Sequence, residues 1–353
     1  MDNPNSRQNI VKIKEAVDEQ LMQLPFYEQR TKSSINLLEE ESWNQREEGG
    51  YLVEFPRLMN AFEGISKGLY IIAGETNIGK SALTMSLAWQ LARNNDPIHV
   101  IYYAIDDDET VICARLLAMM AKIPISVITK PKKWQKTHPE WVLRREQAIK
   151  EFKETVPKSF SIVSSVHLGG NSIELVIKDV ARIYNDVQTR YNHKNVVVCI
   201  DALHDLTTTS YKLSESVAAT KYVSSQLKDE IMKKYKIPVL VTAELRKSDK
   251  QRLNARPTLD DIKDSAAIKY DCDVAMLCYS EVQLNLPDPK VYYTRSDKPS
   301  YQKFPVLEVN VLKNKLSDFK AHLFYELVPE MSMLHEADDT RSRYYLDAIN
   351  GLV

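Results

Sequence analysis

The sequence is poor in features that would place it in several familiar classes. Only nine of its 353 residues are glycine, only four are cysteine, and no apolar run approaches the length of a membrane span. The scattered cysteines have no metal-ligand spacing and suit a reducing cytosol. A formal net charge of −1 gives no overall basic field to attract nucleic acid. We therefore expect a cytoplasmic protein with no membrane partner, in which any contact with nucleic acid depends on local patches.

Three regions are expected from the pattern along the chain. Residues 1–50 are polar, with an amphipathic helix near residues 8–24 and an acidic linker over residues 37–50. This arm packs on the main domain or docks on another subunit. Residues 51–335 form the main domain, and residues 336–353 form a tail.

The main domain alternates apolar strands with helices, which predicts an α/β fold with a mostly parallel central sheet flanked by helices. The last two strands are separated by a short polar stretch and are expected to form an antiparallel hairpin at the sheet edge. The expected strands are 69–73, 98–104, 160–163, 196–200, 238–242, 273–278, 306–311 and 321–326, and the expected helices are 80–93, 109–121, 141–155, 172–192 and 214–236.

The most informative stretch is Gly74-Glu75-Thr76-Asn77-Ile78-Gly79-Lys80-Ser81, which fits the phosphate-loop pattern G-x-x-x-x-G-K-[ST]. An apolar strand precedes it, and the helix expected over 80–93, whose first turn includes Ala82 as a further nucleotide-binding residue, follows it. This context separates a real site from a chance match in a surface turn. The backbone N–H groups and the helix N-terminus can enclose a triphosphate, with Lys80 on the β- and γ-phosphates and Ser81 on Mg²⁺. The loop predicts ATP and Mg²⁺ as ligands.

Two carboxylate positions belong with this loop. Asp201 directly follows the apolar run 196–200, the form of a Walker-B acid that holds Mg²⁺, although a strand-end cap is the alternative. The run 106–109 is Asp-Asp-Asp-Glu and follows another strand. We interpret Asp106 as the catalytic carboxylate that orients water, and Asp108 or Glu109 as helix caps. The alternative is a solvated helix start.

The order and spacing of five segments resemble the C-terminal motor domain of DnaB-type replicative helicases, ring-shaped motors with a RecA-like core. The segments are Glu54-Phe55-Pro56-Arg57-Leu58-Met59-Asn60, the phosphate loop, Tyr103-Ala104-Ile105-Asp106 with Arg115-Leu116-Leu117-Ala118, Ile200-Asp201-Ala202-Leu203-His204-Asp205-Leu206, and residues 244–273. Within the last one, Glu244-Leu245-Arg246 and Arg256-Pro257 precede Leu259-Asp260-Asp261-Ile262-Lys263-Asp264-Ser265. A further stretch, Lys313-Asn314-Lys315, resembles the family's trans-acting Lys-x-Arg.

The resemblance implies roles for further residues. Glu244 takes the place of a γ-phosphate-sensing Gln, and Lys313 and Lys315 would act on ATP bound by the adjacent subunit, which requires an oligomer, expected to be a hexameric ring. Lys263, Asp264 and Ala266 would line a channel for single-stranded DNA. Lys212 falls in the position of the family's first channel loop. A primase or a loader is a further partner implied by the family.

The departures from the family cluster in the chemical machinery. Asp106 replaces the usual Glu, Glu244 replaces Gln, and Lys315 replaces an arginine finger. Only about fifty residues precede the motor, so the family's primase-recruiting N-terminal domain is expected to be missing. These features leave three functions open: a diverged motor, for example from a phage or mobile element, an ATP-binding assembly or switch protein with weak hydrolysis and no unwinding, and a recombinase-like DNA-binding filament.

One basic stretch lies outside these motifs. Residues 130–136 read Lys-Pro-Lys-Lys-Trp-Gln-Lys, which can contact phosphates and stack a base. The alternative, which we favour, is a solvated loop with Trp134 packed on the body of the domain.

Overall fold

The computed structural model describes residues 25–43, 49–154, 156–211, 216–246 and 256–352. The chain divides into two units, residues 1–49 and 50–353. The described part of the first unit is the helix α2 (Phe26–Trp43), so residues 37–43 of the expected linker are helical instead. Their Leu and Glu side chains are good helix formers, which explains why the helix continues. The helix expected near residues 8–24 lies outside the described residues.

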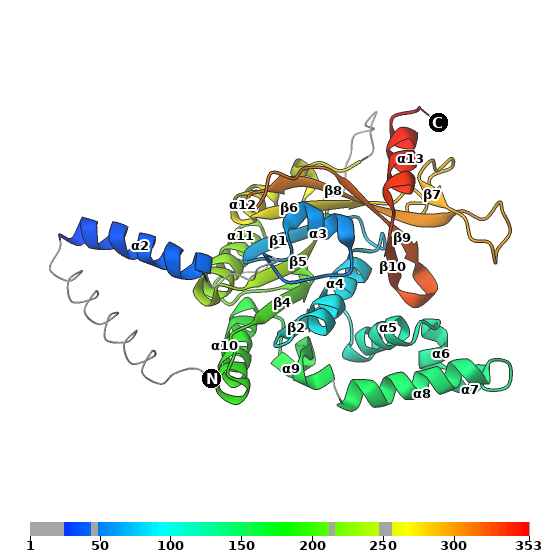
Figure 1. The fold of residues 1–353 in the computed structure, drawn as a ribbon, viewed down its shortest axis with the longest axis horizontal. Coiled ribbons are helices and arrows are strands. Elements are labelled where there is room, and N and C mark those ends of the chain that lie inside the picture. The colour runs from blue at the N-terminus through cyan, green and yellow to red at the C-terminus, as the bar shows by residue number, and fades with distance from the viewer. Residues whose placement is uncertain (1–24, 44–48, 155, 212–215, 247–255, 353) are drawn as a thin grey trace. The chain divides into compact units, whose positions relative to one another are not determined.

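The second unit is built on a ten-stranded sheet with the order β10-β9-β8-β6-β1-β5-β4-β2-β3, and β7 pairs with β8 (Figure 1). Six of its strands, β1 to β6, run parallel, and β8, β9 and β10 add an antiparallel edge. This arrangement matches the expected mostly parallel sheet with a C-terminal hairpin. The strands are β1 (Gly68–Gly74), β2 (His99–Ala104), β3 (Phe160–Ser164), β4 (Val196–Asp201), β5 (Pro238–Glu244), β6 (Val274–Tyr279), β7 (Tyr292–Tyr293), β8 (Phe304–Asn314), β9 (His322–Val328) and β10 (Met333–Glu336).

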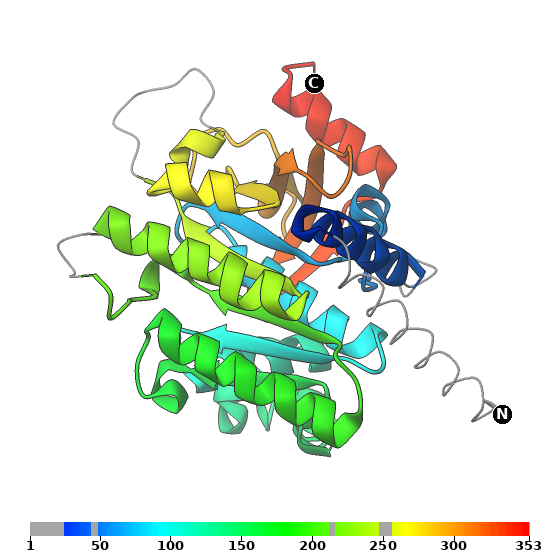
Figure 2. The ribbon, with the colours of Figure 1, turned by 90° about the vertical axis from the view of Figure 1, so that its left-hand side faces the viewer.

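Helices cover both faces of the sheet. Figure 2 shows α10, α11 and α12 in front of it, whereas α4 and α5 lie behind. The helices of the unit are α3 (Pro56–Phe62), α4 (Lys80–Asn94), α5 (Glu109–Ala121), α6 (Ile125–Thr129), α7 (Pro131–Trp134), α8 (Pro139–Glu154), α9 (Ser165–Leu168), α10 (Ile173–Tyr191), α11 (Ser216–Gln226), which continues as a π-helical stretch Leu227–Lys233, α12 (Ser265–Asp271) and α13 (Asp339–Ile349).

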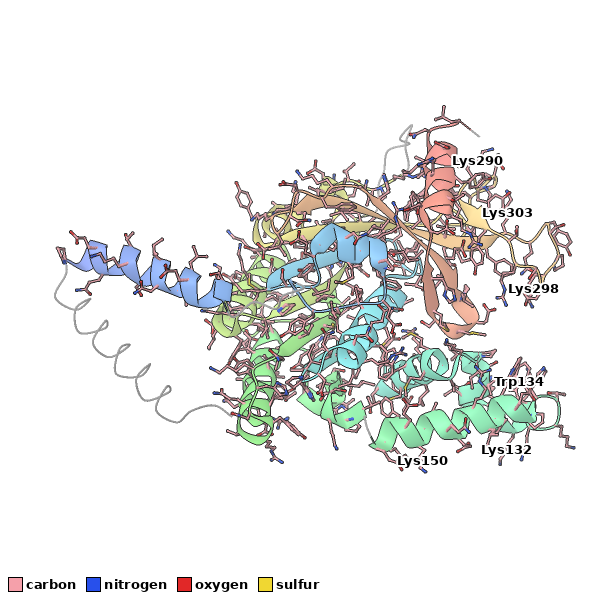
Figure 3. All side chains as sticks on the ribbon, viewed as in Figure 1. Lys132, Trp134, Lys150, Lys290, Lys298 and Lys303 are labelled. Atoms are coloured by element: carbon pink, nitrogen blue, oxygen red, sulfur yellow. The ribbon has the colours of Figure 1, made fainter. Side chains whose placement is uncertain are left out.

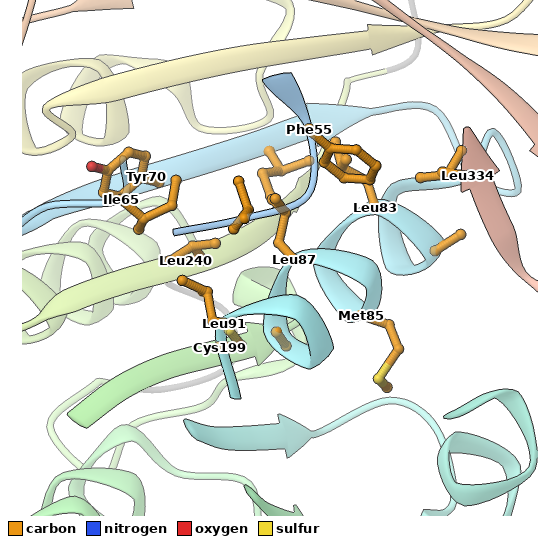
Figure 4. Close-up of a cluster of buried hydrophobic side chains, with 14 of the residues drawn as sticks. Phe55, Ile65, Tyr70, Leu83, Met85, Leu87, Leu91, Cys199, Leu240 and Leu334 are labelled. Carbon is orange, nitrogen blue, oxygen red and sulfur yellow. The ribbon is translucent and has the colours of Figure 1, made fainter. Parts of the chain in front are cut away.

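The two faces carry separate cores because successive strand residues point to opposite sides. On β1, Tyr70 and Ile72 join the core under α3 and α4, and Leu69 and Ile71 join the core under α10 and α12. Figure 4 shows the first of these cores, where Leu83, Leu87 and Leu91 of α4 meet the sheet. The central strands are buried on both faces, as their continuous apolar runs predict.

Within the expected tail, residues 339–349 form helix α13, which packs on the sheet edge. Helix α13 begins after Asp338, whose side chain accepts the Arg341 N–H, and it buries Tyr345 and Ala348 in a cluster with Phe324 of β9. This short amphipathic segment is helical because the sheet edge provides the apolar surface that its few buried residues need. Among the described residues, none of the helices has the combination of length and apolar character needed to cross a membrane.

Candidate functional site

The phosphate loop connects β1 to α4, as the sequence predicts. Gly74 is confined by its neighbours, since a Cβ there would lie 2.4 Å from Ile78 Cδ1 and 3.0 Å from the Cys278 carbonyl oxygen. Gly79, with φ of 110°, directly precedes α4, and no side chain caps that helix. The N–H groups of its first turn therefore remain available to an anion. Thr76 and Asn77 are exposed at the top of the loop, and Ile78 is buried beneath it.

Lys80 lies inside the loop that it would serve. Its Nζ donates to the carbonyl oxygens of Gly74 at 2.9 Å and Glu75 at 2.7 Å, which leaves one of the three ammonium N–H donors. Burial lowers the pKa of Lys80, and the nearby Asp201 and Glu244 carboxylates oppose this shift. The ammonium group is thus held at the loop, with negative charges placed at the neighbouring strand ends.

Asp201 ends β4 on the same face of the sheet as α4. It is 8% exposed, and its two oxygens accept hydrogen bonds from Tyr102 Oη at 3.0 Å and Thr242 Oγ1 at 2.5 Å. These two hydroxyls come from the adjacent strands β2 and β5, so the carboxylate is fixed from both sides. Each oxygen still has a lone pair for a water or a cation. The alternative of a strand-end cap fits less well, because both recorded bonds are to side chains.

The acidic run after β2 divides by role. Asp108 caps α5 by accepting the Thr110 N–H at 2.8 Å, and Asp107 pairs with Arg115 at 2.5 Å. Asp106 is exposed, and its backbone nitrogen lies 3.4 Å from the Asp201 carbonyl oxygen. Within the described residues, its carboxylate has no recorded hydrogen bond or ion pair. Asp107 and Asp108 are therefore engaged by partners within the domain, whereas Asp106 has a free carboxylate as far as the structure describes the chain, and its backbone lies beside that of Asp201.

Glu244, at the end of β5, pairs with a lysine. The Lys263 Nζ lies 3.4 Å from Glu244 Oε2, and both side chains are about half exposed, at 47% and 43%. The backbone joins the same two residues, since the Lys263 N–H donates to the Glu244 carbonyl at 3.0 Å. The structure therefore connects the expected phosphate sensor directly to an expected DNA-channel residue.

His204 reinforces this connection. Its Nδ1 accepts the Glu244 N–H at 3.1 Å, so the proton resides on Nε2, which lies 3.2 Å from the Lys263 carbonyl oxygen. Burial lowers the pKa of His204 and favours this neutral ring. A neutral His204 thus ties the end of β5 to the segment that leads into α12.

The remaining residues expected to bind DNA are placed differently from one another. Asp264 accepts a hydrogen bond from Thr220 of α11 at 3.0 Å, and Ala266 is exposed in the first turn of α12. Lys212 lies outside the described residues. Thr208, from the same loop as Lys212, donates to Glu174 at 2.6 Å, so its hydroxyl is already engaged within the domain.

The two lysines expected to act on a neighbouring subunit also differ. Lys313 donates to the backbone carbonyl of Lys269 and lies 3.7 Å from the Cys272 thiol, whereas Lys315 is exposed. Together with Ala266, Lys269 and Tyr270 they line a cavity of about 390 Å³. Lys313 is therefore anchored within its own chain, and Lys315 is the more accessible of the two.

Arg256 belongs to a largely buried network. Its guanidinium group binds Glu308 at 2.6 and 2.7 Å and Glu281 at 2.9 Å. These two carboxylates, one from β8 and one just after β6, hold the arginine against the sheet.

Four residues of the site escaped the sequence analysis. Tyr102 and Thr242 are polar groups on fully buried strands, a pattern that signals an internal hydrogen-bond partner. His204 and Asp205 lie in the Walker-B segment but had no assigned role. Burial, followed by the charges of Asp106, Glu244 and Asp201, raises the pKa of Asp205 to about 6. Their roles depend on how strand ends meet in space, which spacing along the chain does not reveal.

The Mg²⁺ ion expected at the phosphate loop would need ligands besides protein side chains. Among the described residues, no three His, Cys, Asp or Glu side chains converge as a metal site. Mg²⁺ commonly binds one or two carboxylates together with substrate phosphates and waters. The buried Asp201 oxygens and the Ser81 hydroxyl at the start of α4 fit that donor set.

This chain is similar in sequence to known proteins. The profile of the DnaB-like helicase C terminal domain family matches residues 50–321. A probable replicative DNA helicase of Trieres chinensis is 23% identical over 227 residues, covering 63% of this chain and 46% of that protein. A replicative DNA helicase DnaB of Helicobacter pylori is 24% identical over 252 residues, covering 70% and 47%. The chain thus spans about half the length of the curated relatives it matches.

Solved structures share the fold. One ATPase domain matches with a TM-score of 0.67 at 17% identity, over 87% of this chain and 98% of that one. A DnaB-like replicative helicase, whose structure describes its interactions with primase, matches with a TM-score of 0.67 at 18% identity, over 94% and 76%. These likenesses confirm the α/β ATPase fold expected from the sequence.

Proposed function

The chain belongs to the DnaB-like helicase C-terminal domain family, and from that premise we propose that it is an ATP-driven motor that assembles as a ring, translocates on single-stranded DNA and separates strands. The observation that carries the proposal is the phosphate loop with Lys80 inside it, beside the buried, doubly hydrogen-bonded Asp201. This pair supplies the phosphate cradle and the metal-side carboxylate that phosphoryl transfer requires.

The proposed roles follow from the positions of the side chains. The N–H groups of the loop, including those of Glu75, Thr76 and Asn77, bind the phosphates, and the Lys80 ammonium group exchanges its carbonyl partners for phosphate oxygens. Ser81 and Asp201 hold Mg²⁺, which neutralises charge that develops on the phosphates. Asp106 orients the attacking water. Its side chain is one methylene shorter than a glutamate, which favours slow turnover unless the strand end moves closer.

The proposed coupling to DNA uses the exposed border of the nucleotide site around Glu244 and Lys263, which we call the rim. Lys263, Asp264 and Ala266 belong to the channel side, and the ion pair of Lys263 with Glu244 links that side to the nucleotide. Lys315, exposed beside α12, acts on ATP bound to the next subunit, and Lys313 supports it from its anchored position. A site completed by a neighbour requires a head-to-tail ring of copies. The related helicase solved with its primase interactions suggests primase as a further partner.

Strand displacement on a forked duplex tests the proposal. We expect ATP and Mg²⁺ to support displacement, single-stranded DNA to stimulate ATP turnover, and Lys80→Ala to lower turnover at least a hundredfold. Lys194→Ala is the matched control, because Lys194 is exposed and precedes β4, at the amino-terminal ends of the parallel strands, whereas the phosphate loop follows the carboxyl end of β1. Oligomers that form with ATP but displace no strand would instead identify a nucleotide-switched assembly protein.

A further inference from the structure

A small helical lobe lies at one end of the second unit. Helices α6, α7 and α8 pack on α5 around a core of their own, and in Figure 1 they lie at the opposite end of the unit from α12. Figure 2 agrees, because α12 faces the viewer there and the lobe lies behind the sheet. The lobe core consists of Ala114, Ala118, Ala121, Ile123, Val127, Ile128 and Ala148. The lobe is therefore remote from the segments proposed to line the channel.

The lobe is basic, although the whole chain is nearly neutral. Residues 122–154 contain nine lysines and arginines against four glutamates. Four of these lysines, Lys130, Lys132, Lys133 and Lys136, fall within seven residues around α7, and all four are exposed. We call them the lysine cluster. In the described part of the chain, no carboxylate lies within ion-pair distance of any of them.

The other adjacent lysine pair in the sequence is neutralised. Lys233 and Lys234, adjacent on the helical stretch after α11, pair with Asp229 at 2.7 Å and Glu230 at 2.9 Å. Adjacent like charges repel, and such i,i+4 partners remove that cost. Lys133 lies over the Trp134 ring, with its Nζ 5.4 Å from the ring centre. Since no carboxylate of the described residues pairs with the lysine cluster, an external anion would relieve its repulsion.

The aromatic residues beneath the cluster are turned into the lobe. Trp134 packs against His138 and Trp141 with ring centroids 5.4 Å away in each case, and the His138 and Trp141 rings stack at 3.9 Å. Trp134 is half-buried and joins the lobe core, which agrees with the packing favoured from the sequence, but residues 131–134 form helix α7 where a loop was expected. Figure 3 places Lys132, Trp134 and Lys150 along this lobe. The cluster is thus presented on a packed platform and offers no free ring to a base.

These features identify the kind of partner. Single-stranded DNA is usually bound with bases stacked on exposed aromatic rings, which this surface lacks. Protein interfaces depend on aromatic or apolar anchors at their centre, and the cluster offers charges instead. Duplex DNA presents a phosphate charge about every 1.7 Å along its axis and needs only cations to contact its backbone. We propose that the lysine cluster binds the phosphate backbone of duplex DNA, at a second site outside the proposed channel.

Salt dependence gives the size of the expected effect. Each phosphate contact on duplex DNA contributes roughly −0.9 to the slope of log K against log salt concentration. At 0.1 M salt, one contact therefore raises the affinity by up to about eightfold relative to 1 M salt. Changing both Lys132 and Lys133 to Gln should therefore weaken duplex binding by roughly ten- to sixtyfold and reduce the salt slope by about two.

The experiment measures fluorescence anisotropy of the full chain with a blunt duplex, a forked duplex, a single strand and poly-glutamate, from 0.05 to 0.2 M salt. The variant is Lys132→Gln with Lys133→Gln, and the matched control is Lys233→Gln with Lys234→Gln, which makes the same change of charge at an adjacent, exposed pair. We expect only the first variant to lose duplex and fork affinity. Both should keep single-strand affinity, oligomer size by light scattering, and ATP turnover without DNA.

Each other outcome overturns the proposal in a distinct way. Unchanged duplex affinity in the first variant excludes a duplex site at the lysine cluster. An equal loss of duplex affinity in both variants would show that binding depends on the overall charge of the protein and not on this cluster. A loss confined to the single strand would assign the cluster to the displaced strand. Unchanged duplex affinity with lost binding of poly-glutamate would assign it to an acidic protein. Failure of strand displacement by the unmodified protein would reject the motor and leave this binding result unaffected.

Discussion

Asp201 and Glu244 stand at the ends of neighbouring parallel strands, β4 and β5, in different surroundings. Asp201 is 8% exposed and has both oxygens bonded to hydroxyls of adjacent strands. The Glu244 side chain is 43% exposed and pairs with Lys263, from a segment beyond the sheet. A residue locked into the packed layer tolerates replacement poorly, because any replacement leaves buried partners unsatisfied. At the exposed end of β5, solvent and a counter-charge compensate the Glu244 carboxylate.

The largest expected effect comes from removing the buried charge. Asp201→Asn keeps the shape of the side chain but removes the charge proposed to hold Mg²⁺, so ATP turnover should fall about a hundredfold or more, since such electrostatic contributions amount to several kcal/mol. Steady-state ATP turnover at saturating Mg²⁺ measures it.

The matched control is Asp179→Asn on the other face of the sheet. Asp179, on α10, is 9% exposed and accepts a hydrogen bond from Tyr103 at 3.1 Å, so it repeats the Tyr102–Asp201 contact away from the phosphate loop. Both variants should lower Tm, but only Asp201→Asn should abolish turnover. Equal losses of turnover would show that Asp201 acts through stability alone.

A smaller effect is expected at the rim. Lys263→Ala leaves the Glu244 charge uncompensated near the bound phosphates, so KM for ATP without DNA should rise about 1.5- to fivefold, the range of a half-exposed ion pair worth about 0.2–1 kcal/mol. In a Glu244→Gln background the same change should have little effect, because no carboxylate remains to be neutralised. The four KM values form a double-mutant cycle, and strictly additive effects would mean that the pair does not influence the nucleotide.

The same contrast explains what the sequence could predict. The phosphate loop, Asp201 and the parallel strands were predicted because continuous apolar runs and fixed loop spacing are local consequences of burial. The partners of Asp201 and the links from His204 to Glu244 and Lys263 were not predicted, because they join residues about 40 to 100 positions apart. The α13 segment was expected as a tail because its few buried residues give a weak periodic signal until the sheet edge is in place.

The smallest expected effect is the pH dependence of stability contributed by Asp205, whose carboxyl group is influenced by the charges of both Asp201 and Glu244. Burial and the charges of Asp106, Glu244 and Asp201 raise its pKa to about 6, above the ordinary value near 3.8. The folded state therefore favours the neutral carboxyl. The stability that this gives is complete below about pH 4 and is lost as pH rises through 6. Asp205→Asn removes that loss, so Tm should rise by about 1–2 °C at pH 8, a modest gain because the residue is partly exposed. The gain should disappear near pH 4.

Asp288→Asn is the control of opposite sign, since a hydrogen bond from Lys290 lowers the pKa of Asp288 and its ionised form is the favoured one. A constant difference in Tm between Asp205→Asn and the unmodified protein from pH 4 to 8 would show that folding does not raise the pKa of Asp205, and that the contrast between buried and half-exposed acids ends at Glu244.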